Sequence, residues 1–113
     1  MKQAIENLLR HYATVTNGES ALFEETLQQI SDIHGLSIAE FCDAFALAVA
    51  ERFVAGEIDA DGAEFAMDDL FFSADFSLPA FARAIFDLTE YQAGTPEDIA
   101  KLLLDHKGLR GGP

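Results

Sequence analysis

The sequence predicts an all-α fold, a compact single-domain bundle of five or six short helices. Three observations predict it. Apolar residues recur at the three- and four-residue spacing of an amphipathic helix in six successive segments. Residue types that start and end helices separate these segments. No stretch alternates apolar and polar residues for long enough to indicate a strand.

The first two helices are expected before Gly35. Residues 2–16 have the helical apolar spacing, and Asn17-Gly18 ends them, because these residue types adopt the left-handed conformation that closes a helix. Ser20 is expected to cap the second helix, which extends to Gly35. The loops are short, so neighbouring helices should pack antiparallel or at steep angles.

The third helix has the clearest start. Ser37 is followed three residues later by Glu40, a pattern that predicts a capping box. Gly56 is expected to close this helix, and the fourth helix follows from near Asp59 to about Phe72. The apolar ladder of the third helix consists of Ile38, Phe41, Cys42, Phe45, Val49 and Phe53.

Prolines mark the last two helices. The fifth is expected to begin at Ser77, with Pro79 in its first turn, where the missing N–H of proline is tolerated. Gly94 is expected to end it. Thr95 followed by Pro96 then predicts the start of the sixth helix, since threonine caps and proline fits the first helical position.

The chain is long enough for one domain and one core. Half of its 113 residues are hydrophobic, so neither disulfides nor a structural metal are needed for stability. Residues 1–107 are expected to form the domain, and residues 108–113 a flexible C-terminal tail. Cys42 is the single cysteine, and no signal peptide or membrane-spanning segment is indicated, so the expected location is the cytoplasm.

Charge is the unusual property of the composition. The chain has 20 acidic and 7 basic side chains, for a formal net charge of −13. Between residues 11 and 100 lie eighteen of the acids but only two bases, Arg52 and Arg83. A surface of this sign repels phosphate, so direct binding to nucleic acid or to an anionic membrane is not expected. A basic protein is the expected partner.

Catalysis is not expected. The sequence has no glycine-rich phosphate loop, no Gly-x-Ser-x-Gly elbow and no His-Glu-x-x-His motif. His11, His34 and His106 lie in three separate segments without metal-ligand spacing, which is typical of surface or helix-end histidines. Cys42 lies on an apolar ladder and is expected to be a buried, inert thiol. No cofactor and no metal site are predicted.

Residues 57–68 resemble a calcium-binding EF-hand loop in part. Asp59, Asp61 and Gly62 stand at the third, fifth and sixth loop positions. The first position holds Glu instead of Asp, and Asp68 at the twelfth is shorter than the bidentate Glu of such loops. The favoured interpretation is an ordinary turn in which Asp59 caps the fourth helix. Calcium binding remains an open alternative.

An acidic stripe on the fourth helix is the first part of a candidate binding surface. Asp61, Glu64 and Asp68 share one face, although like charges at this spacing cost about a few tenths of a kcal/mol per pair. Either a basic docking partner or solubility, including in a salty cytoplasm, would favour such a stripe. These three and Asp69 are expected to point away from the apolar face, so that their reversal to lysine would preserve the fold. Glu57, Asp59 and Asp75 complete the acidic set.

Aromatic residues complete the candidate surface. The run Leu70–Phe76 places three phenylalanines in a helix end and a turn, more than one helix face can bury. Phe72 or Phe76 would then be exposed beside the acids, as an aromatic anchor surrounded by charge. Alternatively, both rings lie in the core beneath the turn.

Three stretches carry a resemblance to a known group of proteins. They are AERFVAGEID at residues 50–59, AMDDLF at 66–71 and LPAFA at 78–82. Over roughly residues 40–92 the chain resembles small acidic all-α bacterial proteins of immunity-protein type, which are mostly uncharacterised. The resemblance implies a cognate toxin as partner, and no binding residues are carried over from it.

The sequence therefore predicts a non-catalytic acidic binding protein. It would inhibit or neutralise a basic partner that acts on nucleic acid, as an immunity protein, antitoxin or phage-encoded inhibitor. In the strictest form it is a nucleic-acid mimic, with carboxylates standing where phosphates bind. The alternative is a housekeeping interaction or assembly module whose acidity serves only solubility.

Overall fold

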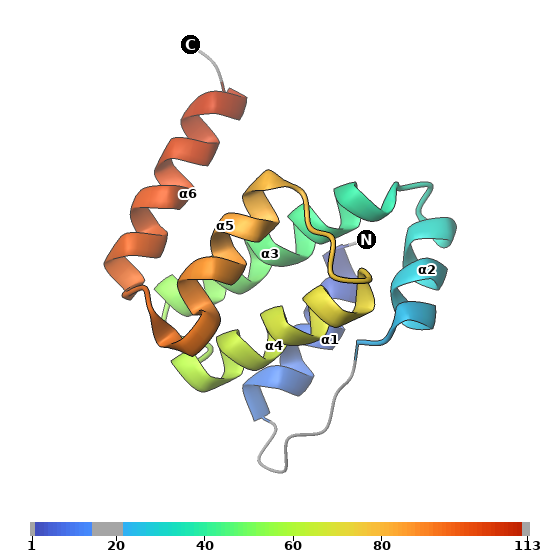
Figure 1. The fold of residues 1–113 in the computed structure, drawn as a ribbon, viewed down its shortest axis with the longest axis horizontal. Helices are drawn as coiled ribbons and strands as arrows, with labels where there is room; N and C mark the ends of the chain where they lie inside the picture. The colour runs from blue at the N-terminus through green and yellow to red at the C-terminus, as the bar shows by residue number, and fades with distance from the viewer. Residues whose placement is uncertain (1, 15–21, 112–113) are drawn as a thin grey trace.

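Six α-helices make up most of the chain in the computed structural model, which describes residues 2–14 and 22–111 (Figure 1). Within those residues there is no strand, and the predicted all-α bundle is confirmed. The elements are α1 (Lys2–Thr14), α2 (Glu24–Ile33), α3 (Ile38–Val54), α4 (Ala60–Ser73), α5 (Ala80–Thr89), the 3₁₀ turn η1 (Glu90–Gln92) and α6 (Pro96–Gly111).

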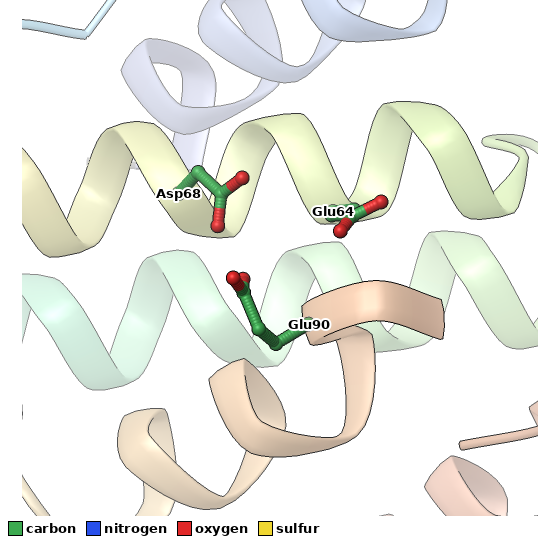
Figure 2. Close-up of side chains that lie close together, drawn as sticks. All are labelled: Glu64, Asp68 and Glu90. Atoms are coloured by element: carbon green, nitrogen blue, oxygen red, sulfur yellow. The ribbon is translucent and has the colours of Figure 1, made fainter. Parts of the chain in front are cut away.

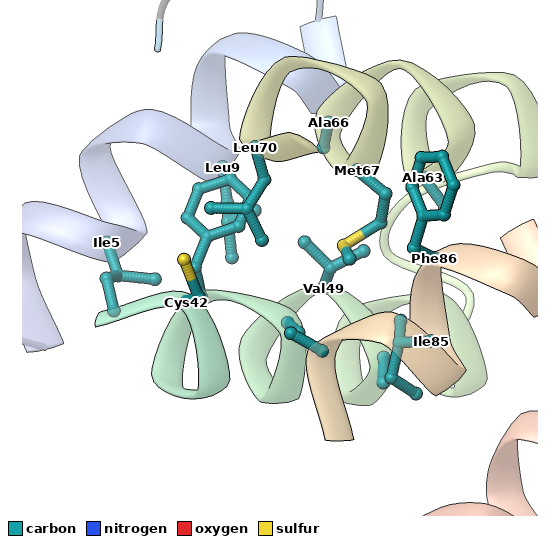
Figure 3. Close-up of a cluster of buried hydrophobic side chains, with 14 of the residues drawn as sticks. Ile5, Leu9, Cys42, Val49, Ala63, Ala66, Met67, Leu70, Ile85 and Phe86 are labelled. Atoms are coloured by element: carbon teal, nitrogen blue, oxygen red, sulfur yellow. The ribbon is translucent and has the colours of Figure 1, made fainter. Parts of the chain in front are cut away.

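Helix α3 is the centre of the bundle, because every other α-helix packs against it. A helix covered on most sides has to be apolar over most of its surface, and α3 is. Figure 3 shows how the core closes around it, with α1 and α4 on one side and α5 on another. The fully or largely buried side chains there include Leu9, Phe41, Cys42, Phe45, Val49, Met67, Leu70 and Ile85.

No single helix among the described residues has both the length and the apolar composition needed to cross a membrane. Helices α2 and α3 pass that test only as a pair, with a bend of 103° between them.

Two helix starts follow the local sequence as predicted. The Ser37 hydroxyl accepts a hydrogen bond from the Glu40 N–H at 3.1 Å, and the Glu40 carboxylate accepts one from the Ser37 N–H at 3.0 Å. Thr95 and Asp98 form the same reciprocal pair at the start of α6, at 3.2 and 2.9 Å. These capping boxes satisfy N–H groups that a helix start otherwise leaves unpaired.

Helix α5 starts later than predicted, at Ala80 instead of Ser77, and Pro79 is its N-cap instead of a first-turn residue. A residue before proline is disfavoured in helical conformation, which delays the start. Proline has no side chain that can cap, and the carboxylate of Asp43 on α3 supplies that function. Its Oδ1 accepts a hydrogen bond from the Ala82 N–H at 3.2 Å, so a neighbouring helix caps α5.

Glycine closes α2 and α3 as predicted. Gly35 and Gly56 have left-handed φ angles of 65° and 78°, which glycine adopts without steric cost. The predicted N-cap of the second helix, Ser20, and the predicted end of the first, Asn17-Gly18, lie outside the described residues. In the described part, α2 begins at Glu24.

Helix α6 extends to Gly111, so its last four residues belong to the segment 108–113 that the sequence predicts as a tail. Glycine within a helix costs about 1 kcal/mol relative to alanine, which weakens a helix without ending it. From Glu97 to Gly111 every residue has the backbone N–H that a helix requires.

A buried hydrogen-bond network joins α1, α4 and the segment before α2. The Tyr12 hydroxyl donates to the Asp69 carboxylate and accepts from the Leu22 N–H at 3.0 Å. The Ser73 hydroxyl donates to the Leu22 carbonyl at 3.0 Å. Asp69 is only 7% exposed. The expectation that it points away from the apolar face was therefore wrong, and its reversal to lysine would bury a charge beside the core.

This network gives a first testable prediction. Replacement of Tyr12 by phenylalanine keeps the ring but removes the hydroxyl, so Asp69 loses a donor and the Leu22 N–H loses its acceptor. We expect Tyr12→Phe to lower the free energy of unfolding by about 1–3 kcal/mol, measured by urea denaturation. Tyr91, which is exposed on η1, provides the matched control. Equal stability of Tyr12→Phe and Tyr91→Phe would contradict a stabilising role for the network.

Candidate partner-binding surface

Four of the candidate residues lie on one stripe of α4, and η1 packs against the acidic part of that stripe. Asp61, Glu64, Asp68 and Phe72 follow one another at three- and four-residue spacing, which places them on one helix face. Asp61 and Phe72 are exposed, whereas Glu64 and Asp68 are half-buried. The stripe is therefore acidic at the start of α4 and aromatic at its end.

The first residues of the stripe belong to a helix start and not to a calcium loop. Asp59 is the N-cap of α4, and its Oδ1 accepts a hydrogen bond from the Gly62 N–H at 2.8 Å. From Ala60 onward the chain is helical, so residues 57–68 do not form the open twelve-residue loop of an EF-hand. The turn-and-cap interpretation of this segment is confirmed.

The turn η1 covers the acidic part of the stripe. Glu64 Oε2 accepts a hydrogen bond from the Tyr91 N–H at 2.8 Å, and the Gln92 side-chain amide donates to Asp61. Tyr91 and Gln92 both have left-handed φ angles, 52° and 55°, which are uncommon for such residues. Gly94, expected to end the fifth helix, instead follows η1. The carboxylates of the stripe thus hold a strained turn of the same chain.

Glu64, Asp68 and Glu90 form a tight cluster of carboxylates between α4 and η1 (Figure 2). One oxygen of each lies within 4.8 Å of the others. The pKa of Asp68 is raised to about 7, first by burial and then by a hydrogen bond with Glu90 and the negative charges of Glu90, Glu64 and Asp69. Protonation of Asp68 relieves the repulsion among these carboxylates. Oxygens at this spacing are also a donor set that suits a hard cation.

No feature of the sequence indicates that Glu90 belongs to this cluster of carboxylates. It lies 22 residues after Asp68 in a turn whose conformation is typical of glycine or asparagine, yet it contains neither at the left-handed positions. The packing of η1 on α4 brings it to the stripe.

Phe72 and Phe76 are both exposed, at 62% and 57% of their surfaces. Their rings lie 5.3 Å apart and nearly perpendicular, and the Phe71 ring contacts both. The backbone places them there at a cost, because Asp75 and Phe76 have φ angles of 56° and 62°. Aspartate tolerates this conformation, whereas for a bulky residue such as phenylalanine it is an outlier.

The aromatic cluster continues inward onto α5. The Phe71 ring stacks on the Phe86 ring with centroids 4.5 Å apart. The Arg83 guanidinium lies 5.8 Å from the Phe71 centroid and 5.6 Å from that of Phe86. It also pairs with the Asp87 carboxylate at 3.0 Å. An arginine of the chain itself therefore covers the inner half of the cluster.

Two of the predicted residues lie at the opposite end of α4. Glu57 is exposed and pairs with Arg52 at 3.5 Å, and Arg52 also pairs with Glu6 at 3.4 Å. Asp59 is occupied as the N-cap. At 1.5 Å of rise per residue, α4 separates Asp59 from Phe72 by about 20 Å. The nine candidate residues thus do not form one patch, and Phe72, Asp75 and Phe76 form the part that combines aromatic and acidic exposure.

The cysteine and histidines lie apart from this surface. Cys42 is buried, and burial, followed by the charge of Asp43, raises the pKa of its thiol to about 11. A thiol with such a pKa is a poor nucleophile. The His106 ring stacks on Phe81 at 3.9 Å, and the His11 ring contacts Tyr12 edge-on.

Comparison of the chain with protein-family models, curated proteins and solved structures found no match.

The carboxylate cluster gives a second prediction, on pH dependence. The pKa of Asp68 rises from 3.8 to about 7 on folding, so the folded state binds more protons between these pH values. The stability that comes from this raised pKa is fully present below pH 4 and is lost as the pH rises through 7. We expect Asp68→Asn to be more stable than the wild type at pH 8 and to lose this advantage toward pH 5, as measured by the thermal midpoint.

Asp105→Asn is the matched control, because Asp105 is exposed on α6. This variant should follow the pH dependence of the wild type. If Asp68→Asn changed the thermal midpoint by the same amount at pH 5 and pH 8, Asp68 would not be the titrating group.

Proposed function

We propose that this protein is a non-catalytic acidic binding protein that docks on a basic partner protein through Phe72 and Phe76 and thereby inhibits or neutralises it. The observation that carries the proposal is the exposure of both rings on a backbone that is left-handed at Asp75 and Phe76. Such strain is concentrated at binding and catalytic sites, where surrounding structure maintains it.

The free-energy cost of exposing these rings on a left-handed backbone supports a function in binding. Full burial of a phenylalanine contributes about 1.5–3 kcal/mol, and each of these two forgoes roughly half of it. Left-handed backbone costs roughly 1–2 kcal/mol at a residue other than glycine. A partner that covers the rings would recover the burial term on binding. Large aromatic side chains at the centre of an interface are also the residues that most often dominate binding energy.

Charge supports a basic partner. The formal net charge of −13 creates a field that accelerates encounter with a positive surface, and Asp75, the exposed residue before Phe76, adds a carboxylate to the same turn. Proteins that act on nucleic acid carry such basic surfaces. An immunity protein, an antitoxin and a phage-encoded inhibitor are three biological forms of this function. A protein that covers a phosphate-binding surface would compete with nucleic acid for it.

A second candidate is an interaction or assembly module whose acidity serves solubility. It is favoured by the internal use of the stripe, since Asp61 and Glu64 already hold η1. The two functions differ in their salt dependence. Docking of an acidic surface on a basic one weakens as salt screens the charges, whereas an interface that does not use charge responds little.

The third prediction tests the docking surface. We expect Phe72→Ser/Phe76→Ser to keep the helical circular dichroism spectrum, because neither side chain is in the core. Binding of the partner captured from the source cell should weaken by about 2 kcal/mol or more, roughly thirty-fold, in titrations at low salt. Leu104→Ser is the matched control, since Leu104 is an apolar residue of α6 that is 71% exposed.

The same complex should release the partner at high salt, and an excess of nucleic acid should displace this protein from it. Undiminished affinity of the double variant would place the interface elsewhere. If this protein, its partner and nucleic acid formed a ternary complex, the protein and nucleic acid would not compete for one surface. Inhibition would then have to come from a contact beside the nucleic-acid site.

A further inference from the structure

The aromatic cluster already binds one cation, the Arg83 guanidinium of the chain itself. On its inner side the Arg83 guanidinium lies within 6 Å of the centroids of Phe71 and Phe86 and pairs with Asp87. This geometry is a cation–π contact combined with a charge-assisted hydrogen bond. The chain thus combines stacked rings, a guanidinium and a carboxylate at the surface of α5.

The outer side of the cluster also combines exposed rings with a carboxylate on the same turn. Phe72 and Phe76 expose more than half of their surfaces, and their rings are nearly perpendicular at 5.3 Å. Asp75, the residue before Phe76, is exposed. Among the described residues, the recorded cation–π contacts are those of Arg83 with the inner rings.

We propose that Phe72, Asp75 and Phe76 form a recognition site for arginine side chains of the partner, in preference to lysine. The inference rests on the proposed function and names the chemistry of its partner, an exposed arginine-bearing segment. A guanidinium is planar and weakly hydrated, so it stacks on an aromatic face while its N–H groups bind a carboxylate. A lysine ammonium is a strongly hydrated point charge and gains less from a ring face.

The charge of the molecule agrees with this occupant. A carboxylate on the turn that carries Phe76, within a strongly acidic protein, attracts any cation, so attraction alone does not discriminate between arginine and lysine. The discrimination between arginine and lysine has to come from the faces of the Phe72 and Phe76 rings. The rings and the carboxylate therefore make separable contributions, the first to selectivity and the second to affinity.

The test uses two fluorescein-labelled peptides that differ only in their basic residue. In each, arginine or lysine alternates with glycine-serine spacers, and binding to the full chain is followed by fluorescence anisotropy at low salt. We expect the arginine peptide to bind the wild type about two- to five-fold more tightly, since arginine gains more than lysine from each of the two exposed rings. Equal affinity for both peptides would overturn the inference.

Two variants test which side chains produce the preference for arginine. Phe72→Leu/Phe76→Leu keeps apolar side chains at both positions but removes the ring faces, so the preference for arginine should fall to about one. Asp75→Asn keeps a residue that tolerates the left-handed backbone, and it should weaken both peptides while their ratio is preserved. Arginine preference that persists in the leucine variant would overturn the inference, because the selectivity would then arise elsewhere.

The outcomes also separate this inference from the proposed function. If both peptides bind equally and Phe72→Ser/Phe76→Ser weakens both, the docking surface stands and arginine selectivity fails. If the serine variant binds both peptides as the wild type does, the docking surface fails as well. Thermal unfolding of each variant, with a midpoint close to that of the wild type, shows that the differences do not come from loss of the fold.

Discussion

The hydroxyl of Tyr12 holds three parts of the chain at one point, and the orientation of α4 depends on it. It binds Asp69 of α4 and the backbone at Leu22, while Ser73 binds the same segment from one turn further along α4. Side chains of a helix keep fixed angular offsets, so an inward Asp69 determines where its neighbours point. Asp68 then faces η1, and Phe72 faces solvent.

The parts of the fold that the sequence predicts are those decided by local contacts. The capping box at Ser37, the N-cap Asp59 and the start of α6 at Thr95 each involve residues three apart in the chain. The start of α5 is different, since it depends on Asp43 from another helix. The turn η1 has a left-handed backbone without glycine, so nothing in its sequence indicates it.

The candidate surface was predictable in its residue types but not in their roles. Helical spacing places Asp61, Glu64 and Asp68 on one stripe, yet it contains no information on whether the stripe meets solvent or another segment. Asp69 shows the limit, because adjacent residues on a helix differ by about 100° and point to different environments. The exposure of Phe72 and Phe76 depends on how the turn after α4 folds back, which is a property of the tertiary structure.

The position of Cys42 has a practical consequence for following the dynamics of this protein. Its side chain is 0% exposed, on the helix against which every other helix packs. An alkylating reagent reaches such a thiol only when the surrounding helices separate, and fraying at the chain ends does not uncover it. The single cysteine is thus an intrinsic reporter of large-scale opening. Its labelling rate, compared with that of an unfolded chain, gives the population of opened molecules without an introduced probe.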